Sequence, residues 1–336
     1  MKIRSKAPLR LGLAGGGSDV SPYSDMYGGL VLNATINLSA YCTIEPLDAP
    51  VMRVSAFDAG VKTEVPLGDS SGAILIDGVY ARIVKDFGPV PCGFAITSYN
   101  DAPAGSGLGT SSTMVVCILK CFAEWMDIAL SDYELAHLAY QIEREDLGLS
   151  GGKQDQWAAA FGGFNFMEFT PSGQVVVNPL DVKDWIVSEL ESSMLLYFTG
   201  RSRSSDAIIR QQQKATRSGS AVAVEAMHRI KQSALDMKEA LLAGNFEAFA
   251  SILGSAWEDK KKMADAITNP QIQEAFDTAM QAGAISGKVS GAGGGGFIML
   301  MVPPEKRMDV ASALSALPGK VVPFQFTPKG ARAWKL

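Results

Sequence analysis

Four clusters of glycine in the sequence could hold an anion against bare backbone. They are GGG at 15–17, GSGLG at 105–109, GG at 151–152 and GAGGGG at 291–296. The most informative segment is PAGSGLGTSST at 103–113, because it joins a predicted strand to a predicted helix. Unobstructed N–H groups and the positive end of that helix favour a polyphosphate, and the hydroxyls that follow could reach a phosphate-bound magnesium ion. The alternative is a glycine-rich turn in which Thr110 or Ser111 is an ordinary helix N-cap.

Two carboxylates follow this loop, and their positions suit phosphoryl transfer. Glu143 lies near the end of a predicted helix, and Asp155 follows 155 − 143 = 12 residues later, across the turn LGLSGG. One carboxylate could bind magnesium beside a triphosphate while the other accepts the proton of an attacking hydroxyl. The alternatives are that Glu143 is a solvated member of the run ERED and that Asp155 is the N-cap of the next helix.

Other catalytic motifs fail on their context. No Gly-x4-Gly-Lys-Ser/Thr loop is present. The GxGxxG at 291–296 precedes an apolar strand instead of opening a helix, which argues against a dinucleotide site. The GxSxG around Ser150 follows a helix instead of a strand, so a hydrolase is only an alternative. With His137 and His228 as the sole histidines, a His-rich zinc site is excluded.

Strand patterns dominate the first hundred residues, and helical patterns dominate the second half. Strands are predicted over 2–13, 29–47, 52–57, 92–100, 161–169, 193–200, 285–290, 296–302 and 320–326. Helices are predicted within 70–88, at 111–126, from Ser131 to near Gly148, at 204–216, 220–243 and 245–267, from Pro270 and from Glu305. The helix at 111–126 is apolar nearly all round, which indicates burial under a sheet. The charged run at 259–262 is expected to be a solvated helix face.

Composition bounds the class of protein. At 336 residues, with 47% hydrophobic and 19% charged residues, the chain should form about two domains. Acidic residues exceed basic ones by 35 − 30 = 5, so charge gives no attraction to nucleic acid or to acidic membrane surfaces. The four cysteines have no CxxC spacing and no apolar leader opens the sequence, which favours a reducing cytoplasm.

Three segments occur together in the order that is typical of one superfamily. They are KAPLRLGLAGGGSD at 6–19, PAGSGLGTSS at 103–112 and KVSGAGGGGF at 288–297. With them the chain resembles the GHMP kinases, which include galactokinase, homoserine kinase and mevalonate kinase. The resemblance implies a two-domain α+β fold. We expect an ATP-binding α/β domain like ribosomal protein S5 at 1–185 and a helix-rich, ferredoxin-like α+β domain at 186–336.

The resemblance also implies roles for individual residues. The second motif would hold the ATP phosphates with Pro103, Ala104, Gly105, Ser106, Gly107, Leu108, Gly109, Thr110, Ser111 and Ser112. Ser111 and Glu143 would bind Mg²⁺. Asp155 matches the aspartate that acts as base toward the acceptor hydroxyl, and Arg10 matches the basic residue beside it. A guanidinium there would help to balance the charge that builds on phosphoryl oxygens.

The first motif would meet the acceptor sugar. Residues expected at the sugar are Gly15, Gly16, Gly17, Ser18, Asp19, Gly152, Gly293 and Gly294. Asp19 could bind paired sugar hydroxyls, or it could form an Asx turn or an N-cap. A phosphorylated substrate needs cations, and we expect them from Lys153, Arg201 and Arg203. The third motif would pack against the nucleotide loop and close the cleft between the domains.

Within the superfamily, three further segments look like those of the bacterial D-glycero-D-manno-heptose 7-phosphate kinases. They are EREDLGLSGGKQDQ at 143–156, TGRSRSS at 199–205 and SAWEDKKKM at 255–263. This resemblance implies ATP-dependent phosphorylation of the anomeric hydroxyl to the 1,7-bisphosphate, with a sugar phosphate and ATP as the partners. Whether the chain forms a homodimer stays open. The alternatives are a kinase for another sugar, such as fucose or galactose, and a non-catalytic sensor of sugar or nucleotide.

Overall fold

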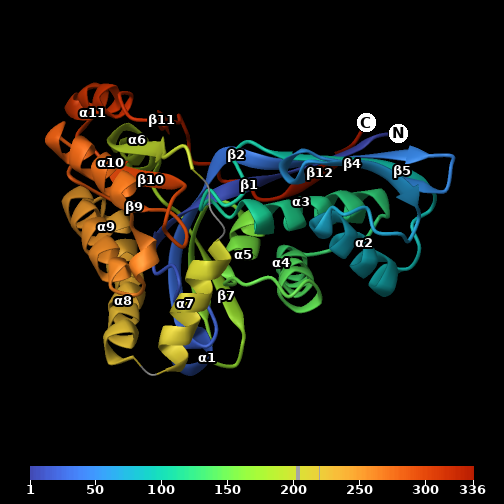
Figure 1. Ribbon diagram of the computed structural model, residues 1–336, viewed down its shortest axis with the longest axis horizontal. Coiled ribbons are helices and arrows are strands. Elements are labelled where there is room, and N and C mark those ends of the chain that lie inside the picture. Colours follow the sequence, from blue (N-terminus) through green and yellow to red (C-terminus); the bar gives the residue numbers. More distant parts are fainter. Residues whose placement is uncertain (202–204, 219) are drawn as a thin grey trace.

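Two β-sheets organise the chain in the computed structural model, which describes residues 1–201, 205–218 and 220–336 (Figure 1). The first sheet runs β12-β1-β2-β5-β3-β4, and β6 and β7 extend it from β2. Its strands are β1 (Ile3–Ala14), β2 (Gly29–Leu47), β3 (Val51–Ala56), β4 (Val61–Pro66), β5 (Gly93–Asn100), β6 (Phe164–Phe169), β7 (Val175–Leu180) and β12 (Arg332–Lys335). The second sheet runs β11-β8-β10-β9 and consists of β8 (Met194–Phe198), β9 (Ser286–Val289), β10 (Phe297–Met301) and β11 (Lys320–Val321).

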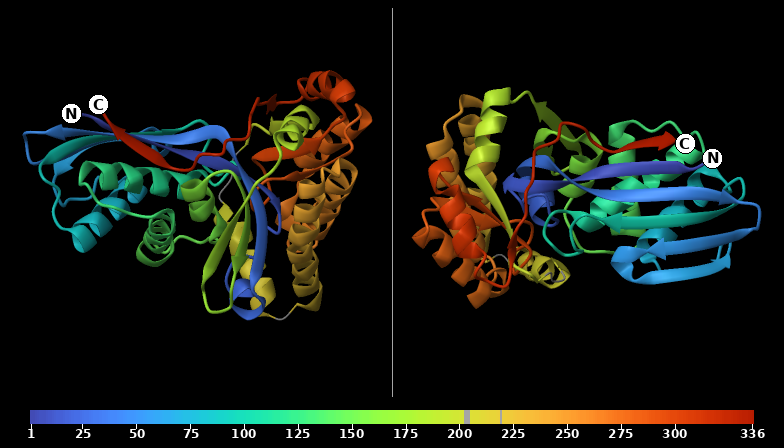
Figure 2. Two further views of the ribbon diagram at one scale, coloured as in Figure 1. Left: turned by 180° about the vertical axis from the view of Figure 1, so that it is seen from behind. Right: turned by 90° about the horizontal axis from the view of Figure 1, so that it is seen from above.

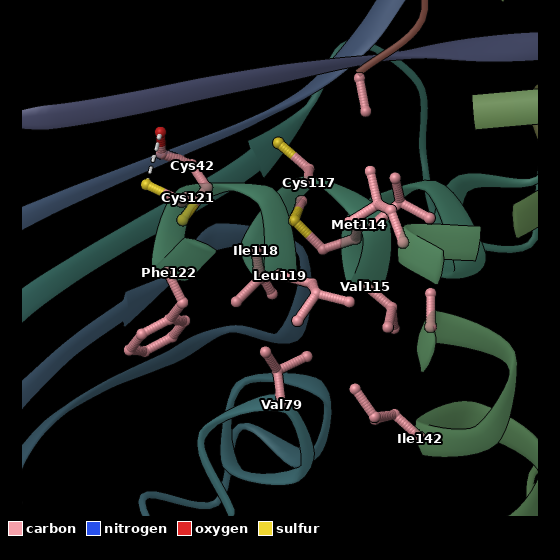
Figure 3. Packing of buried hydrophobic residues seen from close by; sticks show 14 of the residues in the cluster. Cys42, Val79, Met114, Val115, Cys117, Ile118, Leu119, Cys121, Phe122 and Ile142 are labelled. Carbon is pink, nitrogen blue, oxygen red and sulfur yellow. Dashed lines mark hydrogen bonds between the residues drawn. The ribbon is translucent and has the colours of Figure 1, made fainter. Parts of the chain in front are cut away.

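Helices cover one face of the first sheet (Figure 1). They are α2 (Ile74–Phe87), α3 (Thr110–Trp125), α4 (Asp132–Gln141), the π-helical turn η2 (Ile142–Asp146) and α5 (Gln154–Phe161). As its apolar surface predicts, α3 is buried nearly all round, with Cys117 and Cys121 toward the strands and Leu119 toward α2 (Figure 3). Burial raises the pKa of Cys117 to about 12, so this thiol stays protonated and inert. All four cysteines are free.

The second sheet carries the other helices. They are α6 (Asp184–Ser193), α7 (Ser205–Arg217), α8 (Ala221–Ala243), α9 (Phe246–Lys261), α10 (Pro270–Gln281) and α11 (Arg307–Leu314). Short helical segments are α1 (Tyr23–Tyr27), η1 (Phe57–Ala59), η3 (Asp265–Ile267) and η4 (Pro304–Lys306). The expected helix at 245–267 is too long by 267 − 261 = 6 residues, because Ala264 adopts an extended backbone after α9 ends. Across the described ranges, no helix combines the length and the apolarity that a membrane span requires.

The end of the chain returns to the first sheet, which the sequence patterns did not predict. β12 pairs antiparallel with β1, so the two ends lie side by side (Figure 2). Before it, Thr327 exchanges backbone hydrogen bonds with Thr35 and Gly163, and Ala331 donates to Ala159. The final residues of the expected second domain, 186–336, therefore pair with the first sheet. The boundary near residue 185 stays a prediction.

One apolar cluster joins the two sheets. It contains Leu9, Leu11 and Leu13 of β1 together with Met237 of α8 and Phe249 of α9. Since side chains alternate along a strand, the even-numbered residues of this part of β1 point the other way. Burial of one face of β1 between the sheets therefore presents Arg10 and Gly12 on the opposite face, where a cavity opens.

Candidate active site

The loop before α3 presents backbone donors and no side-chain cap. Gly105, Gly107 and Gly109 have φ angles of 72°, 85° and 76°, and Gly109 is the N-cap of α3. Since Gly109 is the N-cap and has no side chain to accept a hydrogen bond, the alternative of a hydroxyl cap at Thr110 or Ser111 is wrong. The N-terminus of a long buried helix is thereby left to an anion.

The third glycine motif packs directly on this loop, as expected. The hydroxyl of Ser290 donates to Gly107 O at 2.8 Å, and the N–H of Phe297 donates to Ser106 O at 3.0 Å. Gly107 permits the contact, because a β-carbon there would stand 2.4 Å from Ser290 O. The loop of the first sheet and the loop of the second sheet therefore form one wall.

Arg10 and Asp155 form a largely buried pair beside the loop. Arg10 Nε and Nη2 each lie 2.7 Å from Asp155 Oδ1, while Arg10 Nη1 donates to Gly107 O at 2.6 Å. The Arg10 side chain is 5% exposed and that of Asp155 is 21% exposed. Asp155 Oδ2 faces Gly109. The arginine thus fixes one carboxylate oxygen and directs the other toward the loop, and the N-cap alternative for Asp155 is wrong because Lys153 is the N-cap of α5.

Glu143 is buried, contrary to the alternative of a solvated residue. It lies on η2 and is 2% exposed. Its Oε2 accepts from Gln156 Nε2 at 2.7 Å, and its Oε1 lies 3.2 Å from Arg144 Nη1. Gln156 also donates to Ser112 Oγ at 3.2 Å. Two neighbours therefore hold this carboxylate at the start of α3.

Asp19 caps a helix from another part of the chain. Its Oδ2 accepts the N–H groups of Lys153 at 2.9 Å and of Gln154 at 3.0 Å, at the start of α5. Its Oδ1 accepts from Gly17 N–H at 3.1 Å. The N-cap alternative for Asp19 is wrong, because Pro22 is the N-cap of α1 and Lys153 is that of α5; the carboxylate instead binds the first N–H groups of a distant helix. The carboxylate ties the first motif to the helix that carries Asp155.

These residues surround one cavity of about 520 Å³, a volume that suits small-molecule sites. Residues of the predicted site that line it are Arg10, Gly16, Gly17, Asp19, Gly105, Gly107, Gly109, Thr110, Ser111, Ser112, Glu143, Gly152 and Asp155. The cavity thus brings together the catalytic candidates, both metal candidates and most of the phosphate loop. Their binding roles stay predictions.

Other predicted site residues do not line this cavity within the described part of the chain. These are Gly15, Ser18, Pro103, Ala104, Ser106, Leu108, Lys153, Arg201, Gly293 and Gly294. Ser18 is fully buried and its hydroxyl donates to backbone carbonyls, so it shapes the turn.

Neither described member of the expected phosphate clamp lines this cavity. Lys153 Nζ lies 5.9 Å from the centre of the Tyr140 ring. Arg201 lines a separate cavity at the start of α10, together with Gly294. Arg203 lies outside the described residues. The N–H of Lys153 donates to Asp19 Oδ2 at 2.9 Å, which fixes the backbone there, and the role of these cations toward a phosphate stays a prediction.

Six charged or amide side chains of the cavity wall were missed from the sequence. They are Arg144, Gln154, Arg210, Gln212, Lys260 and Lys288. Lys260 is 6% exposed, so the expectation of a solvated face for the whole run at 259–262 is wrong. Helical spacing could have predicted this burial. Leu253, Ala256 and Trp257 form the buried face of α9, and Lys260 follows them at i+7, i+4 and i+3. Burial lowers the pKa of Lys260 to about 8 and also lowers that of Lys288.

The hydrolase alternative would need a general base beside Ser150. Ser150 lines the cavity, but among the described residues that line it there is no histidine. His228 Nδ1 lies 2.6 Å from the Tyr23 hydroxyl, and the His137 ring packs edge-on against Trp157. A serine nucleophile needs an adjacent base, so the geometry does not support this alternative.

Comparisons with known proteins cover both halves of the chain. The family described as GHMP kinases N terminal domain matches residues 74–163, and GHMP kinases C terminal matches residues 237–320. A D-glycero-alpha-D-manno-heptose 7-phosphate kinase of Campylobacter jejuni is 46% identical over 338 residues, 99% of each chain. An L-fucokinase/L-fucose-1-P guanylyltransferase of Bacteroides fragilis is 29% identical over 331 residues, which are 89% of this chain and 34% of that protein.

Solved structures agree with this assignment. A D-glycero-D-manno-heptose 1-phosphate kinase from Bacteroides thetaiotaomicron is 56% identical, with a TM-score of 0.85 over 99% of both chains. The galactokinase of Lactococcus lactis shares the fold at 17% identity, with a TM-score of 0.77 over 98% of this chain and 95% of that chain. The expected two-domain α+β fold is confirmed. The chain therefore belongs to the GHMP kinase family of ATP-dependent phosphotransferases.

Proposed function

We propose that the protein transfers the γ-phosphoryl group of ATP to the C1 hydroxyl of D-glycero-D-manno-heptose 7-phosphate, giving the 1,7-bisphosphate and ADP. The observation that carries the chemistry is the Arg10–Asp155 pair beside the uncapped N-terminus of α3, inside one cavity. The similarity to a heptose 7-phosphate kinase at 46% identity supports the choice of acceptor. With all four cysteines free, the cytoplasm is the proposed location.

The chain's own residues account for the transfer. Backbone N–H groups of the loop at 105–112 bind the polyphosphate, and the dipole of α3 adds to their attraction. Asp155 Oδ2 accepts the proton of the C1 hydroxyl while the new P–O bond forms and the bond to ADP breaks. Arg10 keeps Asp155 in place and supplies positive charge near the phosphoryl oxygens.

Magnesium fits the oxygen donors at the start of α3. Within the described residues, no three acidic, histidine or cysteine side chains form a metal cluster by themselves. Mg²⁺ commonly takes one or two protein oxygens together with substrate phosphates and water. Glu143 and Ser111, which line the same cavity, would provide those oxygens. When bound, the ion would neutralise phosphate charge.

The sugar would bind between the first motif and α7. Asp19 uses both carboxylate oxygens for backbone N–H groups, so amides are the better candidates for contacts with sugar hydroxyls. Gln154 Oε1 and Gln212 Nε2 are buried atoms without a partner among the described residues, and both residues line the cavity. One accepts and the other donates, which suits a polyhydroxyl ligand. Arg210 of α7, in the same wall, becomes our candidate for the substrate phosphate.

The first test is a coupled assay of ADP release with ATP and magnesium. Its acceptors are heptose 7-phosphate, heptose 1-phosphate, fucose, galactose and mevalonate. Selective turnover of the 7-phosphate supports the proposal, whereas preference for the 1-phosphate would agree with the description of the Bacteroides thetaiotaomicron structure and move the reacting hydroxyl. Turnover of fucose would favour the relative that is 29% identical. No turnover of any acceptor would favour a sensor.

A second test addresses the carboxylates. Asp155→Asn should reduce kcat at least a thousandfold with little change in ATP affinity, because the amide cannot accept the proton. Glu143→Gln should raise the magnesium concentration that gives half-maximal activity. Glu145→Gln is its matched control, since Glu145 is an exposed residue on the same turn. Normal turnover in Asp155→Asn would contradict its assigned role.

A further inference from the structure

Lys260 is a buried cation in the cavity wall that the proposed reaction does not yet use. Its neighbours on α9 behave as surface residues: Lys261 pairs with Glu258 at 2.7 Å and Lys262 with Asp259 at 2.9 Å. Successive helical residues point about 100° apart, so Lys260 points inward instead. There its ammonium group donates a hydrogen bond to Gly291 O.

No carboxylate balances the charge of this lysine. In the part of the chain that the structure describes, neither Lys260 nor Lys288 forms an ion pair, and Lys288 Nζ donates to the carbonyls of Gly12 and Leu13 at 3.0 and 3.1 Å. Burial and the nearby charge of Arg10 lower the pKa of Lys260, while Asp19 opposes them. An unpaired cation is expensive to bury. A ligand anion at this point would remove that penalty.

The surrounding contacts identify which anion. Gly291, which accepts from Lys260, packs on Gly107 of the phosphate loop, and Arg10 links Gly107 to Asp155. The ammonium group therefore lies where the end of the polyphosphate must meet the hydroxyl that Asp155 activates.

We propose that Lys260 is a catalytic residue that contacts the γ-phosphoryl group of ATP and carries part of its charge during transfer. The inference rests on ATP as the donor and does not depend on the identity of the sugar. Lys260 gives and takes no proton in the step: the hydroxyl proton goes to Asp155, and the electron pair of the broken P–O bond leaves with ADP. Lys288 positions β1 beneath it, because its two carbonyl partners lie two and three residues after Arg10 on that strand.

The test compares two nucleotides that differ by one phosphate. Binding of ADP and of the β,γ-imido analogue of ATP, each with magnesium, is measured by calorimetry for the wild type, Lys260→Met and Lys262→Met. We expect Lys260→Met to weaken binding of the analogue at least tenfold and binding of ADP less than twofold. The same substitution should lower kcat at least a hundredfold. Lys262→Met is the matched control and should match the wild type, since its side chain is 52% exposed.

A structural role for Lys260 gives a different result. If the lysine only holds Gly291, its loss should loosen the loop and weaken ADP and the analogue equally, which would overturn the proposal. Unchanged binding of both nucleotides with a raised KM for the sugar phosphate would also overturn it, because the cation would then face the acceptor. Lys260→Gln, which keeps a donor and removes the charge, repeats the comparison if the methionine variant does not fold.

The proposed function fails in a distinguishable way. A wild-type protein that binds both nucleotides but turns over no sugar phosphate contradicts the proposed function and leaves the Lys260 comparison intact. A wild-type protein that binds neither nucleotide overturns both.

Discussion

A single methyl group at Gly107 should separate the two glycine loops. In Gly107→Ala the new β-carbon would stand 2.4 Å from Ser290 O, whereas ordinary contacts begin at 3.4 Å. The loops must therefore move apart by about 3.4 − 2.4 = 1.0 Å. Such a shift would break the hydrogen bond from Ser290 Oγ to Gly107 O, which is 2.8 Å long.

The expected loss of stability has two parts. A non-glycine residue at the φ of +85° costs about 1–2 kcal/mol. Loss of one or two loop hydrogen bonds adds about 1 kcal/mol each, so the free energy of unfolding should fall by about 2–4 kcal/mol. Misplacement of phosphate donors by about 1 Å should also reduce kcat/KM for ATP about a hundredfold.

Gly60→Ala separates strain from the loop contact. Gly60 has a φ of +66°, lies far from the cavity on the turn before β4, and has open space where a β-carbon would be. The free energy of unfolding of Gly60→Ala should fall by only about 1–2 kcal/mol, and the variant should keep wild-type activity. Urea unfolding and steady-state kinetics are measured on both variants. If Gly107→Ala matches Gly60→Ala in both assays, the loops do not form one wall and the reasoning fails.

Three further results are expected. Leu119→Ala, in the fully buried part of α3, should lower the free energy of unfolding by about 2–4 kcal/mol, whereas Leu242→Ala at a half-exposed site should change it by less than about 1 kcal/mol in the same urea titration. Ser111→Ala should raise the magnesium concentration for half-maximal activity, and an unchanged magnesium titration would exclude Ser111 as a ligand. Because the pKa of Lys260 is about 8, binding of the ATP analogue at pH 8 should take up about half a proton, as the phosphate charge raises that pKa. At pH 6 this lysine is charged before and after binding, so it should contribute no proton uptake there. Proton uptake is measured by calorimetry in buffers of different ionisation enthalpy. Uptake at pH 8 that persists in Lys260→Met would refute the assignment.

Features that depend on neighbours in sequence could be predicted. The capping box of Ser131 and Glu134 is present, and the apolar surface of the segment at 111–126 gives the buried helix α3. Glycine spacing and a following helix are also local information, and they place the loop at 103–112 at the start of α3; its binding of phosphates stays a prediction. The role of Arg10 was expected only from the family resemblance. The structure shows that its guanidinium group forms an ion pair with Asp155.

Features that depend on contacts between distant residues could not be predicted from the sequence. Asp19 and Gln154 are 135 positions apart, so no local pattern shows that the carboxylate caps α5. Arg201 stands in a motif that resembles the heptose kinases, yet it lines the cavity beside α10. Lys260 was expected to be solvated because it is charged, although its position on α9 places it on the buried face of the helix.

The return of β12 to β1 has a consequence for the order of events during synthesis. The edge of β1 that pairs with Lys335 begins at Ile3, so this edge has no partner until β12 has been synthesised, more than 300 residues later. Contacts between such distant segments form slowly, and an unpaired strand edge can pair with other chains. Residues 3–6 of β1 thus gain their second neighbouring strand only after β12 has been made, and until then that edge is open to pairing with other chains.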